Sequence, residues 1–267
     1  LTLTWLDAEL ETYWCAACDT PVLHRGAIIP TTPAPALCEE LREKTDFPPA
    51  SPESQDNGRC IADILARMAS TLRAAEDELG RIDARAGDGD HGMGMTRGSA
   101  AAAEAAARAV ACGAGAASVL AMAGDAWGDR AGGTSGALWG LALRTWSACL
   151  CDQAAITPTT IAEGAIAALE AIVRLGRAQP GDKTLVDALD PFARTLRDEV
   201  SAGKSLPEAW AVAAQAATVA AEATAQLTPK LGRARSHTQR SLGHPDAGAV
   251  SLAMVARLVG ELLASRA

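Results

Sequence analysis

Three aspartates lie within eight positions of one glycine-rich stretch, "RIDARAGDGDHGMGM", residues 81–95. Asp83, Asp88 and Asp90 follow the spacing D-x4-D-x-D, and the intervening glycines allow the chain to turn between them. Carboxylate oxygens are hard ligands that suit Mg²⁺ or Ca²⁺, although the later glutamate of a calcium EF-hand loop is absent. The stretch predicts a metal site, or alternatively an acidic turn that stabilises the start of the next helix through the helix dipole.

A second glycine-rich stretch, "RAGGTSGALWG", spans residues 130–140. Two glycines precede Thr134 and Ser135, which open an apolar helix. Free backbone N–H groups and hydroxyls at a helix N-terminus form a site for anions, above all phosphate. The alternative is an ordinary turn with close helix packing, and the pattern of a Walker loop is missing.

A third stretch, "GRARSHTQRSLGHPDAGAV", holds the basic cluster of residues 232–250. Its arginines could bind phosphate, or they could be ordinary surface charges. His91, beside the aspartates, could donate to a phosphate, or it could be a structural histidine. Metal ligands, a phosphate cradle and arginines together are the parts that phosphoryl transfer requires. The charged and titratable residues of the stretch are Arg233, Arg235, His237, Arg240, His244 and Asp246.

These stretches interrupt a chain that otherwise has the periodicity of amphipathic helices from about Gly58 onward. Short connections indicate that neighbouring helices run antiparallel, and no strand pattern follows residue 58. The fold class is therefore all-α, a bundle or a closed helical barrel. The eight predicted helical segments are 59–80, 93–111, 115–129, 134–151, 158–177, 184–202, 206–226 and 247–265.

The region before the helices divides into two parts. Residues 1–34 are too few to fold alone, and residues 35–57, which contain Pro48, Pro49 and Pro52, have the composition of a linker. The expected organisation is an N-terminal segment 1–34, a linker 35–57 and a helical domain 58–267.

The composition of the chain limits the classes of partner and the cellular location that we expect for it. A net charge of −8 argues against nucleic acid or an anionic membrane as the main partner. Seven cysteines at irregular spacing do not form a disulfide framework. No uninterrupted apolar run has transmembrane length and no signal peptide is visible, so the expected location is the cytoplasm.

Four motifs of this chain resemble the nucleotide-binding domain of dihydroxyacetone kinases. They are "IDARAGDGDHGMGM", "GGTSGALWG", "PGDKTLVDALDP" and "GRARSHTQRSLGHPDAGA", in the order and spacing of that family over residues 58–267. Residues 1–34, with "LTWLDAELETYW", resemble the last strand and tail of the dihydroxyacetone-binding domain that precedes this domain in single-chain, ATP-dependent enzymes. The resemblance implies an eight-helix antiparallel up-and-down barrel with an irregular N-terminal extension, and a homodimer is one assembly that it allows.

The resemblance also implies a site. Asp83, Asp88 and Asp90 would hold two Mg²⁺ ions that bridge the phosphates of ATP or ADP, and Arg233 would reach the phosphates as the catalytic side chain. A loop would lie along the nucleotide, Thr134 and Ser135 would contact phosphate, and Gly176 and Leu185 would line the adenine pocket. The loop residues are His91, Gly92, Met93 and Gly94, and the residues that would close the site are Asp246, Ala247 and Gly248.

The implied reaction is transfer of the γ-phosphoryl group of ATP to dihydroxyacetone (glycerone) or another short-chain ketose. In this family a histidine of the partner domain binds the ketose covalently, and no histidine here resembles that site. We therefore expect this chain alone to bind nucleotide without phosphorylating ketose efficiently.

Three positions depart from the family pattern: Gly94 stands where a polar residue is common, Ala137 where proline is usual, and Ser236 where tyrosine is found. None of them alters the aspartates. Two other functions stay open: a carrier subunit of a phosphotransferase system that keeps ADP bound, and a non-catalytic assembly module. The segment 1–34 favours a kinase that exchanges ATP over the carrier, because the carrier relatives are separate subunits. An FAD-cyclising activity is also compatible with these residues.

Overall fold

The computed structural model describes residues 7–20, 23–25, 47–231, 235 and 238–266. By its contacts the chain forms two compact units, Leu1–Lys44 and Thr45–Ala267. Each unit is described by itself below.

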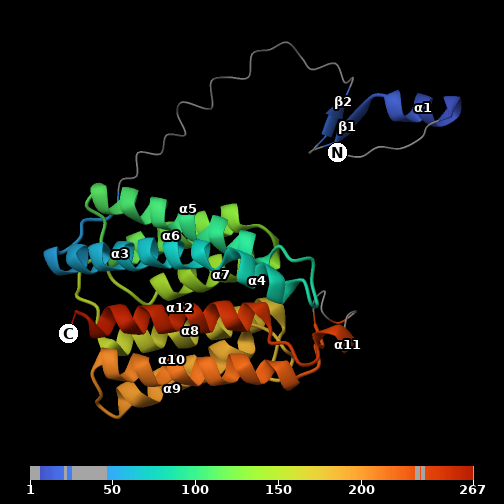
Figure 1. Ribbon diagram of the computed structural model, residues 1–267. Helices are drawn as coiled ribbons and strands as arrows, with labels where there is room; N and C mark the ends of the chain where they lie inside the picture. Colours follow the sequence, from blue (N-terminus) through green and yellow to red (C-terminus); the bar gives the residue numbers. More distant parts are fainter. Residues whose placement is uncertain (1–6, 21–22, 26–46, 232–234, 236–237, 267) are drawn as a thin grey trace. The chain divides into compact units, whose positions relative to one another are not determined.

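The first unit contains one short helix and one hairpin (Figure 1). Helix α1 (Ala8–Cys15) begins after Asp7, whose side chain accepts a hydrogen bond from the Leu10 N–H at 2.8 Å. Strands β1 (Cys18–Thr20) and β2 (Leu23–Arg25) pair antiparallel. In the stretch "LTWLDAELETYW", residues 8–14 are helical and residues 3–6 lie outside the described part, so the resemblance of residues 1–34 to the last strand and tail of the dihydroxyacetone-binding domain stays a prediction.

The second unit is helical, and each of the eight predicted segments contains a helix. Its elements are α3 (Pro52–Ala74), α4 (Glu76–Asp83), α5 (His91–Ala111), α6 (Ala116–Ala131), α7 (Gly133–Ser147), α8 (Pro158–Gly176), α9 (Val186–Ser201), α10 (Leu206–Ala223), the 3₁₀ turn η1 (Thr224–Gln226), α11 (Thr238–Ser241) and α12 (Ala247–Ala264). The all-α prediction is confirmed.

Three helix boundaries differ most from the prediction. Helix α3 begins at Pro52, inside the predicted linker, because Ser51 caps it by accepting from the Ser54 N–H at 3.1 Å and proline suits the first helical turn. The predicted segment 59–80 is divided at Ala75 into α3 and α4. Helix α7 ends at Ser147, four residues earlier than expected.

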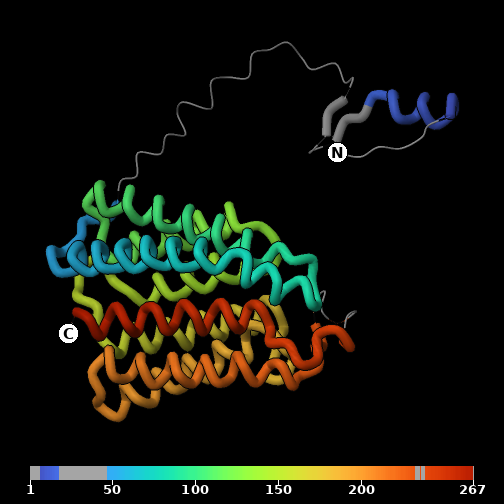
Figure 2. The backbone as a smooth tube through the Cα atoms, viewed as in Figure 1, coloured from blue at the N-terminus to red at the C-terminus, as the bar shows by residue number. Residues whose placement is uncertain are grey.

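The long helices run side by side along one direction (Figures 1 and 2), and their contacts close them into a ring. Contacts run from α3 to α5, α6, α7, α8, α9, α10 and α12 in turn, and α12 contacts α3 and α4. The ring is the eight-helix barrel that the resemblance implies, and α4 forms its short inserted helix. Because the connections gather at the two ends of the barrel, loops distant in sequence meet at one end.

Small side chains allow the helices to approach closely. A Cβ atom on Gly140 of α7 would lie 2.9 Å from the Gly124 carbonyl oxygen of α6. Larger rings fill the remaining space: Trp127 stacks on Trp139 with centroids 5.1 Å apart, and Trp146 lies 6.1 Å from Trp210. An alanine-rich core with few aromatics therefore specifies a tight barrel.

Among the described helices, α12 alone is long and apolar enough to cross a membrane by length and composition. Its buried residues pack inside the ring, including Ala249, Leu252 and Ala256. The buried face of α12 is therefore part of the core.

Candidate functional site

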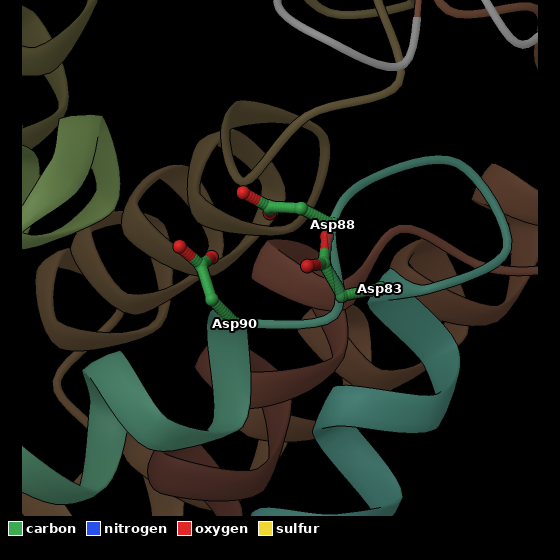
Figure 3. A group of neighbouring side chains, drawn as sticks. All are labelled: Asp83, Asp88 and Asp90. Carbon is green, nitrogen blue, oxygen red and sulfur yellow. The ribbon is translucent and has the colours of Figure 1, made fainter. Parts of the chain in front are cut away.

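The three aspartates converge at the junction of α4 and α5 (Figure 3). Asp83 is the last residue of α4, Asp88 lies in the connecting loop, and Asp90 directly precedes α5. One carboxylate oxygen from each lies within 4.8 Å of the others. Asp90 makes no side-chain capping hydrogen bond to α5, and its charge at the helix N-terminus still suits stabilisation through the helix dipole. The arrangement provides hard oxygen ligands for a divalent cation.

Glycines make this convergence possible. Gly89 has φ of +80°, and its N–H donates to Asp83 Oδ2 at 2.9 Å. The Gly87 N–H donates to the Asp83 carbonyl at 2.6 Å, and a Cβ atom on Gly87 would overlap the Asp83 carboxylate. The loop thus folds back over the end of α4 and turns Asp88 toward Asp83.

A cavity of about 510 Å³ opens beside the aspartates. Its walls come from the acidic loop and the ends of several helices. The sequence-predicted residues that line it are Asp83, Asp88, Asp90, His91, Met93, Gly94, Thr134, Ser135, Gly176, Leu185, Asp246, Ala247 and Gly248.

Gly92 does not line the cavity. A Cβ atom there would overlap the Glu76 carbonyl oxygen and lie 2.9 Å from its carbon, so Gly92 allows α5 to cross α4 closely. The predicted loop of residues 91–94 is the first turn of α5 instead. Arg233 and His237 lie outside the described residues.

Thr134 and Ser135 stand in the exposed first turn of α7. Gly132 and Gly133 precede them with φ of +73° and +62°, a left-handed conformation that favours glycine. The α7 N-terminus has no side-chain cap. An uncapped helix N-terminus with Thr134 and Ser135 in the cavity lining has the features of an anion site.

His91 is buried and engaged with α12. Its Nε2 lies 3.0 Å from Ser251 Oγ, and burial lowers the pKa of the imidazole although the Asp83 carboxylate opposes this effect. A neutral ring that joins α5 to α12 favours the structural interpretation of His91 over donation to phosphate.

Asp246 caps α12 at the opposite wall. Its Oδ1 accepts from the Ala249 N–H at 2.8 Å, and its own N–H donates to Thr224 Oγ1 at 2.8 Å. Desolvation is the main cause that raises the pKa of this half-buried residue's carboxyl to about 6; the carboxylates of Asp187 and Asp83 add to the rise, and the Ala249 hydrogen bond and the Lys183 ammonium oppose it. The site therefore holds more negative charge than its three predicted ligands alone.

Sequence reasoning missed three basic side chains of the cavity: Arg85, Arg97 and Lys183. Arg85 lies in the acidic loop, and Arg97 lies about one helical turn after Met93 on α5. Their spacing from the acidic motif could have identified both arginines. Lys183 sits in the "PGDKT" motif, but nothing in the sequence shows what it contacts.

Comparisons with known proteins agree on the family. The DAK2 domain family matches residues 85–261. The chain is 48% identical over 99% of its length to "L-erythrulose kinase" of Pectobacterium atrosepticum and 49% identical over 98% to "D-erythrulose kinase" of Mycolicibacterium smegmatis. It covers 45% and 46% of those proteins, so it spans about half the length of these curated relatives.

A solved structure supports the fold. The dihydroxyacetone kinase from C. freundii in complex with AMP-PNP and Mg²⁺ matches with a TM-score of 0.55 and 24% identity, over 96% of this chain and 42% of that one. The family match covers most of the helical unit that carries the acidic loop and the cavity. The chain belongs to the DAK2 domain family of dihydroxyacetone kinases.

Proposed function

We propose that this chain is the nucleotide-binding part of a kinase that transfers the γ-phosphoryl group of ATP to a short-chain ketose. The observation that carries the proposal is the convergence of three carboxylates, with ligand atoms within 4.8 Å, at a cavity of about 510 Å³. A nucleoside triphosphate needs neutralisation of its phosphate charge at one end and a pocket for its base at the other. The acidic loop and the cavity provide these two features side by side.

The donor set fits magnesium. Asp83, Asp88 and Asp90 offer only oxygen ligands, and two of the three are exposed enough to leave room for phosphate and water. Two Mg²⁺ ions are proposed here. When bound, they supply the positive charge that phosphate groups require next to carboxylates.

The protein's own groups would orient the nucleotide. The N–H groups and hydroxyls at Thr134 and Ser135 suit a phosphate, and Gly176 and Leu185 would flank the adenine. Arg233 stays a predicted catalytic residue, while Arg85 and Arg97 are the described arginines that line the cavity. Positioning and charge are the main requirements of phosphoryl transfer.

The ketose would come from a partner domain. The relatives named as erythrulose kinases are about twice as long as this chain, which supports a second, ketose-binding part of the same protein or a separate subunit. Their names favour erythrulose as the acceptor over the dihydroxyacetone that the motifs alone imply. We place this reaction in the cytoplasm, where ATP is available.

The test is a reconstituted assay. The chain is supplied with a ketose-binding domain, fused or separate, and consumption of ATP is followed with L-erythrulose, D-erythrulose and dihydroxyacetone. Turnover is expected only when both parts and Mg²⁺ are present, and Asp90→Asn should abolish it. Fast turnover by the chain alone, or none with any ketose and partner, would contradict the proposal. ADP that survives extended dialysis without exchanging for ATP would support the carrier function instead.

A further inference from the structure

Lys183 lies in the loop between α8 and α9 with only 4% of its surface exposed. Its φ is +60°, a left-handed conformation that residues with a Cβ atom seldom adopt. A buried lysine in such a conformation is held there by its surroundings.

Four backbone carbonyls surround the Lys183 ammonium. Its Nζ donates to Thr224 at 2.9 Å and Leu227 at 3.2 Å, both just after α10. It also donates at 2.8 Å to Ser241, the last residue of α11, and at 2.8 Å to His244, between α11 and α12. One side chain therefore joins three chain segments, and it does so through main-chain atoms only.

These segments form one wall of the nucleotide cavity. Ser241 and His244 line it, as do Thr184 and Leu185, which directly follow Lys183. The loop that carries Lys183 is fixed in turn by Asp187 on α9, whose carboxylate accepts from the Thr184 N–H at 2.7 Å and from the Gly181 N–H. The Lys183 loop thus has its own support, and an ion pair between Lys230 and Asp182 at 3.3 Å also joins the two segments at a more exposed position.

We infer that Lys183 is a positioning residue that sets the shape of this wall for the nucleotide by holding the α10–α12 connection against the α8–α9 loop. The inference rests on the proposed function of the cavity. Removal of the ammonium would take this donor from all four carbonyls. Those of Thr224 and Ser241 would keep the backbone N–H groups of Leu227 and His244 as donors. The part-buried carbonyls of Leu227 and His244 would regain a partner by moving toward water. The wall would then loosen while the barrel, whose core is elsewhere, stays folded.

The experiment uses Lys183→Gly, because glycine adopts the left-handed backbone without strain and leaves room for an added amine. Two properties are measured: the Kd of Mg–ATP by calorimetry, and hydrogen exchange of backbone amides between Leu227 and Asp246 in the nucleotide-free chain. We expect Kd to rise roughly 10- to 100-fold, since small misplacements of site groups have effects of this size, and we expect exchange to accelerate. n-Butylammonium should restore both properties, and n-butanol should restore neither.

Lys204→Gly is the matched control, because Lys204 is exposed in the turn before α10 and pairs with Glu199. It should leave both properties unchanged. If circular dichroism shows that the Lys183→Gly chain does not fold, Lys183→Met is used instead, because it keeps most of the aliphatic part of the side chain. The same rise of the Kd and faster exchange are expected for Lys183→Met, without restoration by the amine.

Wild-type affinity and wild-type exchange in the Lys183 variant would overturn the inference. Lost affinity with unchanged exchange, or without rescue by the amine, would also overturn it, since Lys183 would then act by another route. If the wild-type chain binds no nucleotide, the proposed function fails. The inference about Lys183 then fails together with the proposed function. If wild type and variant bind Mg–ATP with equal affinity, only the inference about Lys183 is refuted.

Discussion

At the scale of single residues, the site gathers like charges that its surroundings offset only in part. Desolvation and the carboxylates of Asp187 and Asp83 raise the cost of ionising Asp246, and the Ala249 hydrogen bond and the Lys183 ammonium reduce it. In the metal-free chain the pKa of the Asp246 carboxyl is therefore raised to about 6. A carboxyl that binds protons more tightly in the folded state destabilises the protein once it ionises.

Asp246→Asn should therefore stabilise the metal-free chain at pH 8 by about 1–2 kcal/mol of unfolding free energy. Asparagine keeps the oxygen that caps α12 but carries no charge. The folded pKa lies above the ordinary value, so the wild type gains stability as pH falls through about 6 and this gain is complete below about 4. The advantage of the variant should thus shrink over the same interval. Urea unfolding at several pH values, with a chelator present, measures it.

The exposed Asp198→Asn removes the same charge from the end of α9 and should show no such pH-dependent advantage. A difference between Asp246→Asn and wild type that stays constant from pH 8 to pH 4 would contradict the account of Asp246.

At the scale of elements, the distance between Asp83 and Asp90 depends on how α5 crosses α4. Asp83 ends one helix and Asp90 precedes the other, so the crossing sets the spacing of the carboxylates. Gly92 is the point of closest approach, and its neighbour is backbone, which cannot move aside as a side chain can. The packing of α5 against α4 therefore also determines the geometry of the metal ligands.

Gly92→Ala should separate α5 from α4, lower the unfolding free energy by about 3 kcal/mol and weaken Mg²⁺-dependent nucleotide binding. Thermal unfolding and calorimetry measure the two effects. Gly128→Ala on the exposed side of α6 is the control, because a Cβ atom there meets nothing closer than 3.9 Å. It should stabilise the helix by about 0.5–1 kcal/mol. Equal behaviour of the two variants would show that the crossing does not need glycine at residue 92.

At the scale of the whole molecule, the barrel contains its own core. The buried apolar cluster runs from Leu65 to Val259, and α1 buries none of its residues. The ring closes through α12 against α3 and α4. Closure joins the two ends of the helical unit, so the acidic loop and the α12 N-terminus can form one site.

Deletion of residues 1–44 should leave the barrel intact. We expect the shortened chain to keep its melting temperature within about 2 °C and to bind Mg–nucleotide as the longer chain does, because α1, in the described part of the deleted segment, buries none of its residues. Calorimetry and thermal unfolding of both chains provide the comparison. Loss of nucleotide binding on deletion would show that the first unit takes part in the site.

Much of the fold was predictable because helical periodicity survives in an alanine-rich sequence. The start of α3 was missed because Pro48, Pro49 and Pro52 together favoured a linker, although Ser51 and Pro52 are a helix cap and a first-turn proline. The division at Ala75 carries no glycine or proline to mark it. Tertiary packing, which the local sequence does not express, decides such boundaries.

The site was predictable where ligands are close in sequence. Asp83, Asp88 and Asp90 lie in one motif, and the structure brings their carboxylates together. Gly92 was assigned to the nucleotide because a glycine that approaches a phosphate and a glycine that approaches a helix have the same sequence pattern. Lys183 was missed because its partners are carbonyls 41 to 61 residues away, and any residue type supplies a carbonyl.

Metal-dependent nucleotide binding is the central claim, and calorimetric titration of ATP and ADP into the metal-free chain, with and without Mg²⁺, tests it most directly. Wild type is compared with the double variant Asp88→Asn, Asp90→Asn and with the control Asp56→Asn, Asp198→Asn, which removes two exposed charges elsewhere. The account predicts Mg²⁺-dependent binding by wild type and control, and its loss in the site variant with an unchanged circular dichroism spectrum. Mg²⁺-dependent binding that survives in the site variant, or a wild type that binds neither nucleotide, would contradict it.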